Sequence, residues 1–160
     1  MKFRGLELPD DLKFLDDIGA VKQILLIIQD KIDVEFNSFM EETREPLSKS
    51  GALIKRRMDT DPVSLEEMMG ECLAWSYRVA TLKNDANTFL IIYQILNYEP
   101  KGKDIPEAAR KNIMNLRNLL QFQVFNYLEL TLDRLDKKMI CLQSSLKAEI
   151  AMIEKGIRND

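Results

Sequence analysis

The sequence contains no histidine, and it has only two cysteines, six glycines and five prolines among 160 residues. Histidine is the commonest general base and the commonest metal ligand, so its absence argues against most acid–base catalysis and most metal sites. Two cysteines cannot supply the four ligands of a structural zinc site. The sequence also has no glycine-rich phosphate loop and no serine nucleophile elbow. We therefore expect a protein that is not an enzyme, with no catalytic residues, no cofactor, no metal and no small-molecule substrate.

Long apolar runs are missing as well. The longest uncharged apolar stretches, residues 24–28 and 88–97, are far shorter than the roughly 20 residues that cross a bilayer. The N-terminal residues become acidic by residue 10 and contain no hydrophobic signal core. We expect a cytoplasmic protein without a membrane partner, in which Cys72 and Cys141 stay reduced and lie in the core.

Apolar residues recur at steps of three and four over most of the chain, which is typical of helices. The pattern predicts an all-α fold, an elongated antiparallel bundle of three long helices whose C-terminal helix resembles a coiled coil. We expect one domain over residues 1–160. Its predicted parts are an N-terminal strap at 1–17, helices at 18–45, 62–98 and 106–157, a basic connector at 46–61 and a second connector at 99–105.

Prolines and capping residues set these boundaries. Pro46 is expected to end the first helix, because proline lacks the backbone N–H that a helix interior needs. Asp61 and Pro62 favour the start of the second helix, since aspartate caps a helix and proline suits its first position. Ser64 with Glu67 has the spacing of a capping box and gives an alternative start within three residues.

The last predicted helix carries the most regular apolar stripe. It reads Leu128, Leu132, Leu135, Met139, Leu142, Leu146, Ile150, Ile153 and Ile157. If the second and third helices lie antiparallel across a short connector, residue 142 is level with residue 62, and the remainder overhangs. We expect an oligomer interface formed by Leu142, Leu146, Ile150, Ile153 and Ile157, because water should not face such a stripe. The alternative is that residues 47–58 of the same chain fold over it.

Positive charge is concentrated in one segment of an otherwise acidic protein. Residues 49–58 contain four cations and no anion, although the net charge of the chain is −3. Lys49, Lys55, Arg56 and Arg57 are therefore candidates for phosphate binding, although charge runs are often simply solvated. A second candidate combines Tyr98, Lys101 and Lys103, where the tyrosine could stack on a base or plug the end of a helix.

The architecture of residues 65–156 resembles that of the UvsY-like recombination mediators of tailed phages. The resemblance rests on a long helix ending in Leu96-Asn97-Tyr98, a Gly-Lys connector, and a closing segment from Tyr127-Leu128-Glu129 through Ile153 to Gly156. It implies an all-helical ring-forming protein that binds single-stranded DNA and helps to load a recombinase. In that family the helix before the tyrosine is rich in Lys and Arg, whereas residues 85–96 of this chain contain no cation. The DNA contacts are therefore expected at the connectors instead.

Two functions remain open from the sequence. The first is a homo-oligomeric accessory protein that binds single-stranded DNA and a recombinase, as the resemblance implies. The second is an adaptor or inhibitor that docks a partner protein through an exposed apolar helix seam. The salt dependence of binding distinguishes these two functions, because phosphate binding weakens steeply as the ionic strength rises and apolar docking does not.

Overall fold

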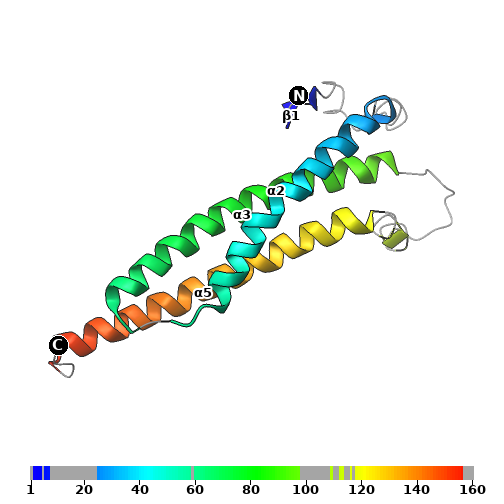
Figure 1. Cartoon of the computed structure of the whole chain (residues 1–160). Coiled ribbons are helices and arrows are strands. Elements are labelled where there is room, and N and C mark those ends of the chain that lie inside the picture. The colour runs from blue at the N-terminus through cyan, green and yellow to red at the C-terminus, as the bar shows by residue number, and fades with distance from the viewer. Residues whose placement is uncertain are drawn as a thin grey trace. The chain divides into compact units, whose positions relative to one another are not determined.

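The computed structural model describes residues 2–4, 6–7, 25–58, 60–97, 109, 112–113, 116 and 118–156. Their elements are two short strands, β1 (Lys2–Phe3) and β2 (Leu6–Glu7), and three long helices, α2 (Gln29–Lys55), α3 (Pro62–Leu96) and α5 (Leu119–Glu154). Figure 1 labels β1 and the three helices. The predicted all-α helical bundle is confirmed. Among the residues described, no helix has the length and apolarity that crossing a membrane requires.

The chain divides into two compact units. The first contains Met1–Glu42 with Asn84–Asn126, and the second contains Thr43–Lys83 with Tyr127–Asp160. Each of the three long helices contributes residues to both units. The division therefore does not separate one continuous N-terminal domain from a C-terminal one, and the expected single domain stays a prediction.

An aromatic cluster forms the core of the first unit. Phe36 and Phe39 of α2 each lie with their ring centroids 5.2 Å from that of Phe89 on α3. Tyr93, one turn further along α3, donates a hydrogen bond of 2.5 Å to Asp33, one turn earlier on α2. Because residue numbers rise on one helix as they fall on the other, the two helices are antiparallel here.

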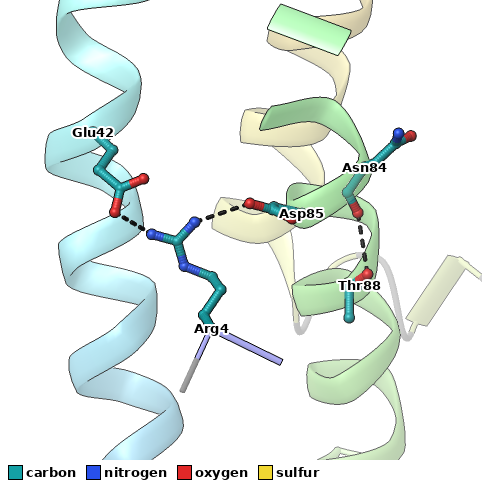
Figure 2. A network of polar contacts seen from close by, with 5 residues as sticks. All are labelled: Arg4, Glu42, Asn84, Asp85 and Thr88. Carbon is teal, nitrogen blue, oxygen red and sulfur yellow. Dashed lines mark hydrogen bonds and ion pairs between the residues drawn. The ribbon is translucent and has the colours of Figure 1, made fainter. Parts of the chain in front are cut away.

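A largely enclosed cation completes this unit. Arg4 occupies the turn between β1 and β2 with a φ of 47°, and its side chain enters the space beside α2 and α3, as Figure 2 shows. Its guanidinium pairs with Glu42 on α2 and, at 2.9 Å, with Asp85 on α3. It also lies 5.2 Å from the centre of the Phe39 ring. The N-terminal hairpin is thus fastened to both helices by one side chain.

The core of the second unit is mainly aliphatic. In this unit Lys83 of α3 pairs with Glu129 of α5 at 2.9 Å, and Lys138 of α5 donates a hydrogen bond of 2.6 Å to the carbonyl of Arg56. Arg56 also pairs with Glu71 of α3, so residue numbers rise along α5 as they fall along α3, and these two helices are antiparallel. The buried apolar residues are Leu53, Leu65, Met68, Cys72, Val79, Leu82, Leu128, Leu135 and Leu142.

The structure corrects the predicted end of the first helix. α2 continues through Pro46 to Lys55 instead of ending at residue 45. A proline inside a helix removes one hydrogen bond and crowds the preceding turn. Pro46 itself is buried, and the two turns that follow bury Ser50 and Leu53, so packing offsets the lost hydrogen bond. The connector before α3 is consequently short, and its residues begin at Arg56.

The start of α3 agrees with the sequence pattern. Its first residue is Pro62, and the Asp61 carboxylate accepts a hydrogen bond of 2.9 Å from the backbone N–H of Ser64. Asp61 therefore caps the helix with its side chain, which selects it over the capping-box alternative at Ser64.

The third long helix is interrupted where an unbroken helix was expected. α5 begins at Leu119, after a turn at Asn118, and the described residues before that turn, 109, 112, 113 and 116, are also helical. Asn118 is fully buried and its side-chain oxygen accepts a hydrogen bond of 2.6 Å from Asn97 at the end of α3. Leu116 and Ile113, which the stripe includes when extended backwards, are exposed. A buried polar contact therefore takes the place of the continued apolar stripe.

Candidate nucleic-acid interface at the end of helix α2

Four cations chosen from the sequence meet at the C-terminal end of α2. Lys49 and Lys55 lie on the helix, not in a connector, and Arg56 and Arg57 follow directly after its last residue. All four are exposed. The unpaired carbonyl groups at a helix C-terminus carry partial negative charge, which stabilises cations placed there. Part of this concentration of charge therefore serves the helix itself.

Folding adds a fifth cation from a distant part of the sequence. Lys138 on α5 reaches the end of α2, where its ammonium group donates to the Arg56 carbonyl at 2.6 Å. The same end of α2 is thereby fixed to α5, and its last carbonyl groups gain a donor. We define the α2-end cluster as Lys49, Lys55, Arg56, Arg57 and Lys138.

One cation of the α2-end cluster is already partly neutralised. Arg56 forms an ion pair of 3.4 Å with Glu71 on α3, and both side chains are about half exposed, at 52% and 50%. An ion pair this exposed contributes between 0 and about 1 kcal/mol, so a phosphate could replace the carboxylate at small cost. Lys49, Lys55 and Arg57 form no ion pair with any residue in the described ranges.

Spacing along α2 gives the α2-end cluster its extent. Lys49 and Arg56 are seven residues apart, so they lie on the same side of the helix and about 10 Å apart along its axis. Lys55 and Arg57 flank Arg56. Successive phosphates of a single strand are separated by similar or smaller distances, and three or four cations over this length can contact several of them.

The second sequence-based patch lies outside the described residues. Tyr98, Lys101 and Lys103 follow Asn97, the last residue described at the end of α3. Their proposed base stacking and phosphate contacts stay a prediction.

The expected oligomer interface on α5 is corrected at Leu142. This residue is fully buried within its own chain, so it cannot face a second subunit. The reason is the register between the helices. Lys83 of α3 lies opposite Glu129 of α5, and the Ser145 hydroxyl lies 3.8 Å from the sulfur of Met58 in the connector. As a result, α3 and the connector cover α5 closer to its C-terminal end than expected. This coverage agrees in part with the alternative in which the chain's own residues fold over the stripe.

The rest of that stripe is exposed to different degrees. Leu146 is half-buried, whereas Ile150 and Ile153 are 42% and 51% exposed. The buried position after Leu142 is Glu149, one heptad later, so the apolar stripe has drifted off the packed face of α5. Ile157 lies outside the described residues. In the described part of α5, only the last one to two turns extend beyond the residues that cover the helix.

The cysteines occupy different environments. Cys72 is buried as expected, and burial raises the pKa of its thiol above the ordinary value, which favours the unreactive protonated form. Cys141 is exposed, which corrects the expectation of a core cysteine. It sits on α5 one position before the buried Leu142, and a helix turns neighbouring residues by about 100°. Within the described ranges no group of three or more Cys, Asp or Glu residues is arranged to hold a metal ion.

Sequence reasoning missed Lys138 as a member of the α2-end cluster. The sequence shows Lys138 as a cation in the last predicted helix. The expected register between the second and third helices, however, placed it level with residue 66 and not with Arg56. Only the contacts between helices decide that register.

In comparisons with known proteins, no family model, curated protein or solved structure matches the chain.

Proposed function

We propose that this protein is a non-enzymatic accessory protein that binds single-stranded DNA through the α2-end cluster. The observation that carries the proposal is that folding gathers five cations from α2, the connector and α5 at one helix end, while the chain as a whole has a net charge of −3. A local concentration of positive charge on an acidic protein attracts a phosphate chain to one place.

The resemblance to the recombination mediators makes the proposal more specific. Such a protein forms a homo-oligomer, binds single-stranded DNA and helps to load a recombinase, and we extend these properties to this chain as part of the proposal. Repeating the α2-end cluster in an oligomer links several weak contacts to one strand and raises the overall affinity.

Alanine replacement of Lys55, Arg56 and Arg57 together tests the proposal. Fluorescence anisotropy with a labelled oligonucleotide at low salt should show affinity falling by tenfold or more, because up to three phosphate contacts are lost. The matched control replaces Lys137, Lys147 and Lys155, three exposed cations of α5 and the turn after it, and keeps the same net charge change. Equal loss in both variants contradicts a specific site, and circular dichroism checks that helicity is retained.

A protein-docking function is the second candidate. The outward side of α3 exposes Val63, Leu73 and Tyr77, which are 62%, 66% and 79% exposed. Apolar side chains at helical spacing are typical of a surface that receives a partner helix. Binding of this kind should persist at salt concentrations that abolish binding to DNA.

A further inference from the structure

One face of α3 in the second unit carries apolar side chains that the bundle leaves in solvent. Besides Val63, Leu73 and Tyr77, it includes the exposed residues Gly70 and Ala74. A Cβ added at Gly70 would meet no atom within 4 Å, so the space above this residue is open. We define the α3 face as these five residues.

The spacing of the α3 face is that of a coiled-coil seam. Val63, Gly70 and Tyr77 are separated by seven residues each, so they lie along one line of the helix, with Leu73 and Ala74 on either side of it. The buried residues of the same part of α3, including Leu65, Cys72 and Val79, lie on the opposite side. α3 therefore exposes apolar residues on a second side in this unit, interrupted by the exposed Glu66, which lies one heptad before Leu73.

We propose that the α3 face pairs with the same face of a second copy of this chain, with the two α3 helices antiparallel about a twofold axis at Leu73. In a symmetric antiparallel pair, residues equally far from the axis in opposite directions lie at the same level. Leu73 then meets Leu73 of the second copy. Tyr77, four residues after the axis, is level with position 69 of the second copy, next to Gly70, where the missing side chain leaves room for the ring.

Charge supports the antiparallel direction. Glu67 and Arg78 are exposed on the flank of the α3 face that also carries Ala74, and neither forms an ion pair with another described residue. In an antiparallel helix pair, flanking residues on the same side of the seam face each other across the interface. Glu67, six residues before the axis, then lies within one residue of the level of Arg78 of the second copy, five residues after it, and the twofold axis creates this pair twice. A parallel pair gives no such match.

A second copy fits this surface better than a foreign helix or DNA. The Leu73 contact places the second copy at one register. The tyrosine over a glycine and the Glu67–Arg78 match both fall within one residue of that register. Leu73 and Tyr77 lack the positive charge that attracts phosphate. The inference is independent of the proposed DNA binding, because it uses none of the cations in the α2-end cluster.

Sedimentation equilibrium of the full chain tests the proposal. The wild type should form dimers of twice 18.6 kDa at micromolar concentration. Leu73→Glu and Tyr77→Glu should each shift the protein to monomer, whereas Ile140→Glu, at a 61% exposed position on α5, should not. A wild type that is monomeric at every concentration overturns the proposal. So does an oligomer that both α3 variants leave intact but that Ile150→Lys with Ile153→Lys dissociates.

Charge reversal gives a readout that a folding defect cannot imitate. Glu67→Arg and Arg78→Glu should each weaken the dimer several-fold, because like charges then face each other. The double variant restores the opposite pairing and should recover most of the wild-type affinity. Failure of the double variant to recover contradicts the antiparallel register.

A cysteine on the twofold axis provides the final test. Leu73→Cys in a Cys141→Ser background should form a disulfide-linked dimer on mild oxidation, because the two residues at position 73 are adjacent across the axis. The control, Leu130→Cys at a 51% exposed position on α5, should form no disulfide-linked dimer under the same conditions. Equal cross-linking of both variants contradicts the proposal.

Discussion

In the first unit the cation Arg4 is almost enclosed, whereas in the second unit four of the five cations of the α2-end cluster are exposed to solvent. The Arg4 side chain is 15% exposed and contacts Glu42, Asp85 and the Phe39 ring. Arg56, the one member of the α2-end cluster that forms an ion pair with a described residue, is 52% exposed. A cation whose partners are already in place stabilises the fold, and a cation left in water is available to a ligand.

The cores of the two units also differ in how many polar contacts they contain. Polar side chains cross between helices inside the first unit, where Tyr93 donates to Asp33 and Asn97 to Asn118. The second unit has an aliphatic core, and its contacts between charged groups of different helices lie at the surface. Directional contacts specify one arrangement of helices, so we expect the first unit to depend more strongly on single side chains.

The largest effect should come from Phe89→Ala. This ring is fully buried and contacts both Phe36 and Phe39 at 5.2 Å, so its removal leaves a cavity and should lower the free energy of unfolding by about 3 to 5 kcal/mol. Urea unfolding followed by circular dichroism measures the change. Ile140→Ala, at an exposed position, serves as the control and should cost less than about 0.5 kcal/mol.

Removing one cation from each unit compares them directly. Arg4→Met keeps the length of the side chain but loses two ion pairs and the contact with Phe39, and should cost about 1 to 2 kcal/mol at low salt. Arg56→Met loses one exposed pair and should cost less than about 1 kcal/mol. Equal losses in urea unfolding would show that the two cations play the same role.

Alkaline pH should reveal the buried tyrosine of the first unit. Burial, followed by the hydrogen bond to Asp33, raises the pKa of Tyr93 above its ordinary value of 10.0. Above about pH 10 the unfolded chain loses this proton while the folded chain keeps it, so stability falls as the pH rises. Tyr93→Phe should cost about 1 kcal/mol at neutral pH and flatten this fall. Tyr127→Phe, at an exposed position, should leave the slope as in the wild type.

The smallest effect is expected for Ser50→Ala in the second unit. Ser50 is fully buried, and its hydroxyl oxygen has no hydrogen-bond partner among the described residues. Burying a hydroxyl without a partner is unfavourable, so alanine should leave the thermal midpoint unchanged or raise it by a few degrees. A clear decrease would mean that the hydroxyl has a partner in solution.

Local sequence rules predicted some boundaries and missed others. The start of α3 at Pro62 can be predicted from neighbouring residues, because the cap formed by Asp61 involves only residues of the same helix. The passage of α2 through Pro46 could not be predicted in this way. There the local cost of proline is outweighed by burial of Ser50 and Leu53, which depends on other helices.

The α2-end cluster and the α5 stripe show the same limit. Periodicity gives the side of a helix that is buried, but not how far that helix slides along its neighbour. The buried state of Leu142 and the arrival of Lys138 beside Arg56 both depend on this register. The exposed cations could be chosen from the sequence because charge clusters are visible there without knowledge of the packing.

The salt dependence of single-stranded DNA binding by the wild type tests the central claim most directly. If the α2-end cluster contacts three or four phosphates, the logarithm of the association constant should fall with the logarithm of salt concentration with a slope of about −2 to −3. The Lys55, Arg56 and Arg57 triple alanine variant should reduce the magnitude of this slope by about 2, because each phosphate contributes about 0.7. A wild type that does not bind the oligonucleotide at low salt, or a slope unchanged in the variant, would contradict the account.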